Sequence, residues 1–213
     1  MKQTQLKRFM AATIDAASNN RPHMAGIWHD EETQRAVSTD GHCMSISKAY
    51  YNPLYANRLI GSDGLEVENA NFPQWRNLPL NIENKSLYRM PLTASLLLDT
   101  AKRTSGGFLV VLVMRSGRSI HTVVHPLRND GGAATINTQN HFQQLYLQHY
   151  ADAQWYALDK FRECPTDVIP TLYIPRNYNA LIVEYDATAD RTYYLNEARI
   201  VMPIKLRTKQ EDK

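Results

Sequence analysis

The strongest constraint on the fold lies near the end of the chain, where an apolar segment contains a proline. The segment reads Arg199-Ile200-Val201-Met202-Pro203-Ile204-Lys205-Leu206 and precedes a charged tail. Proline has no backbone N–H, so a strand that contains one must lie at a sheet edge or end there. We therefore expect Met202, Ile204 and Leu206 to lie near a surface rather than in a closed core. An apolar strand end at a surface suggests a docking groove.

The size and charge of the chain narrow the classes of protein to consider. Its 213 residues suffice for one large domain or two small ones, and 43% apolar residues suffice for a core. A net charge of +3 is too small for a strongly basic nucleic-acid coat, so any DNA contact must come from a local patch. Two cysteines, Cys43 and Cys164, argue against a disulfide scaffold and for a reducing compartment. Because no apolar run approaches about 18 residues and no apolar leader is present, we expect a cytoplasmic protein without a membrane span.

Hydrophobic periodicity predicts helices that alternate with pairs of antiparallel strands, which is an α+β pattern. Predicted helices cover residues 3–18, 93–104 and 139–163. Predicted strands cover about 23–29, 34–39, 42–48, 64–69, 87–90, 108–114, 119–124, 171–174, 180–186, 191–195 and 199–206. The Asp40-Gly41 pair predicts a tight turn, because both residue types tolerate positive φ. A helix followed by paired strands occurs at 3–48 and again at 93–124.

Three separate segments together resemble the bacterial-type DNA polymerase sliding clamp, the β-clamp family. In that family a strand ends in a Thr-Asp-Gly-His turn, which is similar to Thr39-Asp40-Gly41-His42. A family segment of the form Phe-Pro-x-aromatic-Arg-x-x-Leu-Pro is similar to Phe72–Pro79, which is one residue shorter. The family chain closes on Met-Pro-hydrophobic-basic-Leu, which resembles Met202–Leu206. All three occur in the family's order, so their joint occurrence is better evidence than any single match.

The resemblance implies an α+β, DNA-clamp-like fold of antiparallel sheets with helices packed on one face. It divides the chain into an abbreviated clamp-like domain at 1–80, a C-terminal clamp-like domain at 81–207 and a charged tail at 208–213. The family has three domains, and residues 49–71 are too short for the second half of its middle domain. Cys43 also stands where the family usually has a basic residue. The reduced size suits a phage or mobile-element version.

The resemblance also implies one groove that binds short peptide motifs of DNA polymerases and repair factors. The residues assigned to it are Thr39, Gly41, His42, Met44, Arg76, Leu78, Pro79, Met202, Pro203, Ile204 and Leu206. Met202 is adaptable and polarisable, which suits a site with several partners. His42 and Arg76 are expected to supply hydrogen bonds or charge at the rim. The alternative is that Met202, Ile204 and Leu206 are ordinary core residues of a final strand.

A second implied surface contacts DNA. A clamp encircles duplex DNA and holds it through phosphate electrostatics on inward-facing helices. The candidate contacts are Lys2, Lys7, Arg8, Lys102 and Arg103. The alternative is that these residues are solvated helix faces, and Lys102 and Arg103 also suit a helix C-terminus electrostatically.

The function implied by the resemblance is that of a homo-oligomeric, sliding-clamp-like processivity factor that holds duplex DNA and tethers a polymerase or repair factor. A clamp-fold adaptor or partner-binding module that does not encircle DNA is the alternative. We expect no enzymatic activity and no metal or cofactor. The seven histidines and two cysteines lack the spacing of a metal site, and no Gly-x-Ser-x-Gly elbow is present.

Overall fold

The computed structural model describes two compact units of the chain. The described residues are 7–11, 14, 21–77, 87–90, 97–99, 101–103, 108–116, 119–127, 154–161, 171–175, 180–185 and 197–203. The first unit comprises Met1–Ser95 and Glu163–Met202, and the second comprises Leu96–Arg162 and Pro203–Lys213. Within the described residues, no helix has the length and hydrophobicity that crossing a membrane requires.

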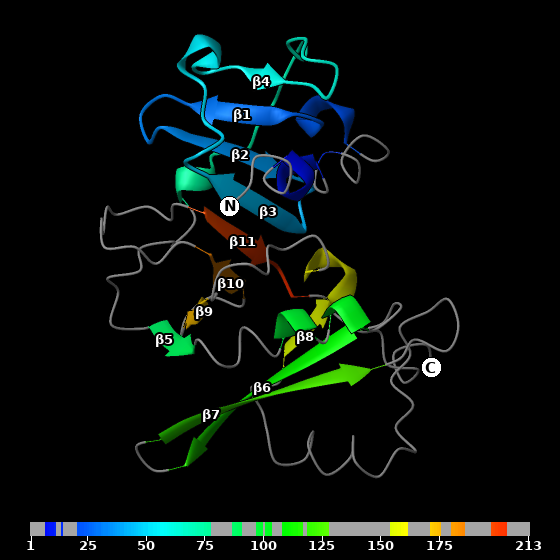
Figure 1. Ribbon diagram of the computed structural model, residues 1–213, viewed down its shortest axis with the longest axis vertical. Helices are drawn as coiled ribbons and strands as arrows, with labels where there is room; N and C mark the ends of the chain where they lie inside the picture. Colours follow the sequence, from blue (N-terminus) through cyan, green and yellow to red (C-terminus); the bar gives the residue numbers. More distant parts are fainter. Residues whose placement is uncertain are drawn as a thin grey trace, which may run out of the picture. The chain divides into compact units, whose positions relative to one another are not determined.

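An eight-stranded antiparallel sheet organises the first unit (Figure 1). Its strands are β1 (Ile27–Asp30), β2 (Arg35–Thr39), β3 (Cys43–Ser47), β4 (Leu59–Ile60), β5 (Leu87–Met90), β9 (Thr171–Pro175), β10 (Leu181–Glu184) and β11 (Glu197–Val201). They lie in the order β4-β1-β2-β3-β11-β10-β9-β5. The β3–β11 pair joins the two predicted domains in one sheet, and the predicted boundary near residue 80 stays a prediction.

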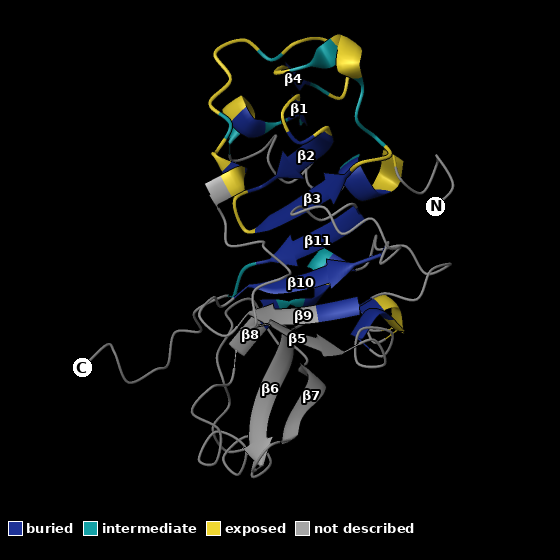
Figure 2. Ribbon diagram, turned by 90° about the vertical axis from the view of Figure 1, so that its left-hand side faces the viewer, coloured by how far each residue is buried: buried dark blue, intermediate teal, exposed yellow. Residues whose placement is uncertain are grey.

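The two faces of this sheet differ in chemistry, because side chains alternate along each strand. One face, here named the apolar face, carries cross-strand partners such as Val37 with Ile46 and Met44 with Ile200. These side chains form a buried cluster with Trp75, Ile182 and others. All residues of β2, β3 and β11 are buried, so both sides of the central strands are covered (Figure 2).

The opposite face, here named the helix face, carries polar side chains that bind the N-terminal helix. Residues 7–11 and 14 are helical, and Phe9, Met10 and Ile14 are buried, as the periodicity predicted. Ser38 Oγ donates a hydrogen bond of 3.1 Å to the carbonyl of Met10, and Ser45 Oγ donates one of 3.4 Å to the carbonyl of Phe9. The helix is therefore tied to the strands by hydrogen bonds as well as by apolar packing.

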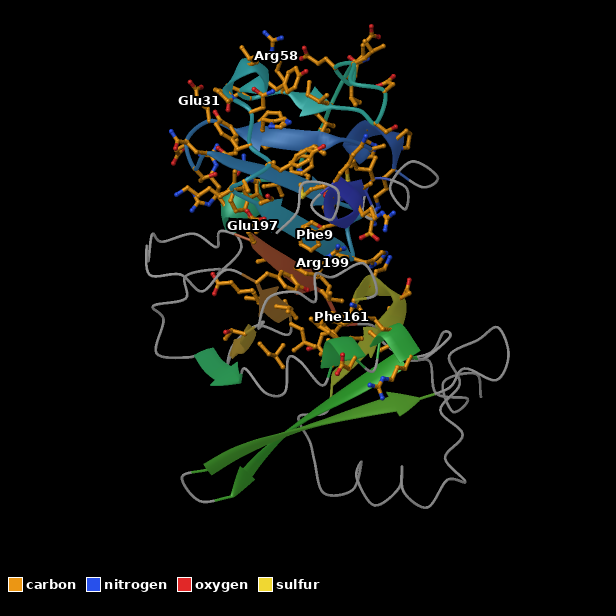
Figure 3. The ribbon with its side chains drawn as sticks, in the orientation of Figure 1. Phe9, Glu31, Arg58, Phe161, Glu197 and Arg199 are labelled. Carbon is orange, nitrogen blue, oxygen red and sulfur yellow. The ribbon has the colours of Figure 1, made fainter. Side chains whose placement is uncertain are left out.

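Arg199 of β11 is the largest charged side chain buried under this helix, with 2% of its surface exposed. Its Nη2 donates to the carbonyl of Phe9 at 2.9 Å, and its Nη1 lies 3.4 Å from Cys43 Sγ. The guanidinium carbon lies 4.4 Å from the centroid of the Phe9 ring, which is a cation–π distance (Figure 3). Burying a charge is costly unless hydrogen bonds and a polarisable surface compensate it, and this site provides both.

The second unit contains a three-stranded antiparallel sheet in the order β7-β6-β8. Its elements are β6 (Phe108–Ser116), β7 (Ser119–Leu127), β8 (Gln154–Ala157) and the 3-10 turn η4 (Leu158–Phe161). The β6–β7 hairpin and the helical residues 97–99 and 101–103 lie where the sequence predicted a hairpin and a helix.

The predicted helix at 139–163 is wrong over residues 154–161, which form β8 and η4; residues 139–153 lie outside the described part. The spacing of the aromatic residues indicated a helix, but Trp155 and Tyr156 are residue types that also favour strands. Residues 154–157 pair with the apolar strand β6, where Trp155 lies opposite Val110, and this pairing stabilises a strand instead of a helix. Long-range pairing of this kind has no signal in local periodicity.

Two smaller strand predictions also need correction. The predicted strand at 64–69 is only an isolated bridge between Ile60 and Glu66, and β4 lies earlier, at Leu59–Ile60. The final strand ends at Val201 instead of running through Pro203, and it lies inside the sheet between β3 and β10. The α+β class itself is confirmed by the antiparallel sheets and the helix that packs on one face.

Replacing Arg199 tests the coupling between the helix and the sheet. Arg199→Met keeps the apolar stem but leaves the carbonyl of Phe9 without its charged donor, so we expect a loss of about 2 kcal/mol in the free energy of unfolding. Urea unfolding, followed by circular dichroism, measures this change in the free energy of unfolding. The matched control is Arg58→Met. Among the described residues, the Arg58 side chain makes an exposed ion pair of 3.8 Å with Glu66, so this substitution should change the free energy of unfolding by less than about 0.5 kcal/mol. Equal losses in the two variants would contradict the role assigned to Arg199.

Candidate peptide-binding groove

A pocket of about 430 Å³ opens on the apolar face of the first unit. The predicted groove residues that line it are Thr39, Gly41, His42, Met44 and Met202. Pro73, Gln74, Trp75 and Ile200 line it as well, and so do Arg21, His23 and Met24. The pocket is thus lined by the turn after β2, by the segment around Trp75 and by Met202, which follows β11. We name it the groove.

The turn at the mouth of the groove is fixed by its own side chains. Asp40 Oδ1 accepts the backbone N–H groups of His42 at 2.8 Å and of Cys43 at 2.6 Å. Thr39 Oγ1 accepts the N–H of Gly41 at 3.0 Å and donates to the carbonyl of Cys43 at 2.8 Å. Gly41 has φ of +85°, a left-handed conformation that glycine adopts without steric cost. The turn therefore holds His42 in one place beside the groove.

The segment after β11 forms a second wall. The N–H of Met202 donates to the carbonyl of His42 at 2.8 Å, which continues the backbone pairing one residue past the strand. Pro203 follows at once and has no N–H to continue it. Met202 is half-buried and packs against the apolar cluster. The proline thus ends the pairing where the methionine side chain enters the groove.

Trp75 forms a third wall, and a buried carboxylate positions it. The indole Nε1 donates to Asp30 Oδ2 at 2.9 Å, and the Nε of Arg76 lies 2.9 Å from the same oxygen. Asp30 Oδ1 accepts the N–H groups of Glu32 at 3.1 Å and of Thr33 at 3.4 Å. Because Asp30 is fully buried, it needs partners for both carboxylate oxygens, and these donors supply them. Trp75 and Arg76 are therefore held as one unit.

Arg76 does not line the groove, although the sequence assigned it there. It lines a neighbouring pocket of about 310 Å³, together with Trp28, Phe72 and Trp75. Trp28 and Phe72 stack with ring centroids 5.9 Å apart and planes inclined by 11°. The guanidinium of Arg76 also pairs with Glu32, so both of its described partners are carboxylates on or beside β1. It thus shares Asp30 Oδ2 with the indole of Trp75.

The other predicted site residues are distributed as follows. Leu78, Pro79, Ile204, Leu206 and Lys2 lie outside the described residues. Pro203 is half-buried. Of the predicted DNA contacts, Lys7 and Arg8 are exposed on the helix of the first unit, and Lys102 and Arg103 are exposed on a helix of the second. Within the described residues, no three His, Cys, Asp or Glu side chains gather as a metal site would require.

Sequence reasoning missed Arg21 and His23, which also line the groove. They flank Pro22, which opens the 3-10 turn η1 (Pro22–Met24). Proline at the first position of such a turn is a local signal, but it does not say what the turn packs against. Met24 is buried, and its N–H bonds to the carbonyl of Arg21 at 2.9 Å. This burial brings the basic pair to the groove.

No protein-family model and no curated protein sequence matches the chain. Among solved structures, it is similar to the β clamp of Helicobacter pylori in complex with diflunisal, with a TM-score of 0.49 and 12% identity over 96% of this chain and 64% of the clamp chain. It is also similar to the same clamp bound to a DNA ligase peptide, with a TM-score of 0.47 and 13% identity over 95% of this chain and 63% of the clamp chain. The chain spans just under two thirds of the length of these clamp chains.

Removing the charge of Asp30 should loosen the Trp75 wall. Asp30→Asn removes the charge to which Trp75 and Arg76 donate. Because the Arg76 side chain is 37% exposed and can turn to water, we expect the loss of these charge-assisted hydrogen bonds to cost about 2 kcal/mol. We expect a matching drop in the free energy of unfolding and stronger acrylamide quenching of tryptophan fluorescence. Glu32→Gln is the control, because Glu32 pairs with Arg76 at an exposed position. If Glu32→Gln matched Asp30→Asn in both measurements, the buried carboxylate would not be what holds Trp75.

Proposed function

We propose that the protein is a sliding-clamp-like processivity factor that holds duplex DNA and tethers a DNA polymerase or repair factor through the groove. The observation that carries this proposal is the meeting of three segments that lie far apart in the sequence. Thr39–Met44, the stretch around Trp75 and Met202 all contribute to one pocket. These are the segments in which the sequence resembles the β-clamp family. If the three short motifs resembled the β-clamp family by chance alone, there would be no reason for them to line the same pocket.

The chemistry of the groove supports a peptide as its ligand. Met44, Trp75, Ile200 and Met202 supply apolar walls, and His42 and Gln74 supply polar groups at the same pocket. A volume of about 430 Å³ lies within the usual range of ligand pockets, about 300–1,000 Å³. Apolar walls with a few polar groups suit a short segment that inserts hydrophobic anchors. The flexible thioethers of Met44 and Met202 can adapt to different anchors, which suits several partners.

The arrangement of the sheet supports simultaneous binding of a protein and of DNA. The groove opens on the apolar face, whereas the N-terminal helix packs on the opposite, helix face. Lys7 and Arg8 are exposed on that helix. A partner in the groove would therefore leave these charges free for phosphates. Contacts of this kind are independent of base sequence, as a factor that moves along DNA requires.

Truncating Met202 tests the groove. Met202 is half-buried, so Met202→Ala should leave the fold intact but remove a wall of the groove. We expect about tenfold weaker binding of a fluorescein-labelled peptide from the clamp-binding segment of a bacterial replicative polymerase, measured by fluorescence anisotropy. Leu54→Ala is the matched control, because Leu54 is 79% exposed and does not line the groove. Unchanged affinity in Met202→Ala would refute the groove.

Reversing charge on the helix tests DNA binding. Lys7→Glu with Arg8→Glu should weaken retention on duplex DNA in a filter-binding assay, and the difference should shrink as salt is raised. Lys48→Glu with Arg58→Glu makes the same change in net charge at exposed positions outside the helix. Equal effects of the two double variants would show that only net charge matters and would contradict the helix assignment.

Sedimentation of the same preparations distinguishes a ring from its alternative. A ring of chains this size requires several copies, so the proposal expects a homo-oligomer. A strict monomer at high concentration would contradict the ring. It would leave a clamp-fold module that binds partners without encircling DNA, provided that the groove still captures the peptide.

A further inference from the structure

The pocket beside the groove, of about 310 Å³, shares a wall with it. Pro73, Gln74 and Trp75 line both, and we name the smaller one the aromatic pocket. Of the residues that the resemblance to the β-clamp family assigned to the groove, only Arg76 is among the described residues that line the aromatic pocket. A ligand that extends from the groove across the shared wall would therefore enter a separate site.

Two stacked rings form the apolar part of the aromatic pocket. The planes of Trp28, on β1, and Phe72 are inclined by 11°, and the ring centroids lie 5.9 Å apart. Both side chains are half-buried and pack against the apolar cluster of the sheet. The cluster thus holds the pair in place, and the exposed part of the pair offers an ordered apolar surface on which another ring can stack.

The charges around the aromatic pocket are already matched, which restricts the ligand. The Nε of Arg76 lies 2.9 Å from Asp30 Oδ2, and its guanidinium also pairs with Glu32. A basic ligand side chain would meet the charge of Arg76, and an acidic one would approach the carboxylate of Glu32. A neutral ring meets neither penalty, and it can stack on the planar guanidinium as well as on the aromatic pair. Because Arg76 keeps its two carboxylates, covering it leaves no charge unpaired.

We infer that the aromatic pocket binds a tryptophan, tyrosine or phenylalanine side chain that flanks the groove-bound segment of the same partner. The inference rests on the proposed peptide-binding function and adds a second contact to it. A volume of about 310 Å³ lies at the lower end of the range of ligand pockets, about 300–1,000 Å³, and suits one large side chain. A segment held in the groove keeps its flanking residue near the second pocket, so the two contacts reinforce each other.

A selection experiment tests the inference on the full chain. Each phage-displayed peptide carries the clamp-binding segment of a bacterial replicative polymerase, with randomised residues on both sides. We expect Trp, Tyr or Phe to be enriched at one flanking position on the wild type but not on Phe72→Leu, which keeps an apolar side chain and loses the ring. Enrichment of charged residues there, or of no residue type, would overturn the inference and leave the groove standing. If the constant segment alone does not bind, the proposed function fails, and the inference with it.

Affinities of the selected peptide then locate the contact. The peptide, and a version with alanine in place of its flanking aromatic residue, are measured by fluorescence anisotropy on the wild type, on Phe72→Leu and on Tyr50→Leu. Tyr50 is the matched control, because it is half-buried and lines neither pocket. We expect about tenfold weaker binding of the aromatic peptide to Phe72→Leu alone, with the alanine version unchanged. Retained binding of the alanine version also shows that the variant is folded. Equal loss for both peptides, or an equal effect of Tyr50→Leu, would overturn the assignment to this pocket.

Competition with oligothymidylate distinguishes a peptide from single-stranded DNA as the occupant. Bases of single-stranded DNA also stack on aromatic side chains. We expect no displacement of the aromatic peptide, because the carboxylate of Glu32 beside Arg76 disfavours a phosphate backbone. Displacement of the aromatic peptide but not of its alanine version would assign the pocket to nucleic acid and overturn the inference.

Discussion

The antiparallel pairing of β3 with β11 is the constraint on which the rest of the first unit depends. It places Ile200 opposite Met44 on the apolar face and Arg199 opposite Ser45 on the helix face. The first pair gives the groove its floor. The second pair gives the N-terminal helix its polar anchors, because Ser45 and Arg199 both donate to the carbonyl of Phe9. One ladder thus supports a binding surface on one side and a helix on the other.

Buried charges have a positioning role in this unit. Arg199 lies under the helix with a carbonyl, a sulfur atom and an aromatic face as partners. Asp30 lies behind the groove with the indole of Trp75 and the guanidinium of Arg76 as partners. An apolar side chain of equal volume would fill either site, but it would not fix the direction of its neighbours. The walls of the groove therefore depend on polar contacts that lie outside the groove itself.

Local signals in the sequence predicted much of this fold. The Asp40-Gly41 turn forms because Asp40 accepts two backbone N–H groups and Gly41 adopts positive φ. The helical face of Phe9, Met10 and Ile14 is buried as its period required. The proline at 203 marks the end of a strand, but the strand is internal, because pairing stops before the missing donor is needed.

Features that arise from long-range contacts could not be predicted in this way. β8 forms because β6 offers an apolar edge to residues whose spacing favoured a helix. Arg21 reaches the groove because Met24 is buried, and nothing near Arg21 in the sequence indicates this. Arg76 was assigned to the groove by its place in a motif, whereas it pairs with Asp30 of β1 and lines the adjacent pocket.

The long sequence separation between β3 and β11 also determines how late in synthesis the groove can form. Cys43 and Arg199 are in contact although they are separated by 156 positions. During synthesis, β1, β2 and β3 emerge long before β11, and β3 remains without this neighbour until the residues of β11 have left the ribosome. Such non-local pairing is slow to form and leaves an open sheet edge meanwhile. A chain interrupted before residue 197 would lack both the strand and Met202, so premature chains would be unable to compete with finished ones for the same partners.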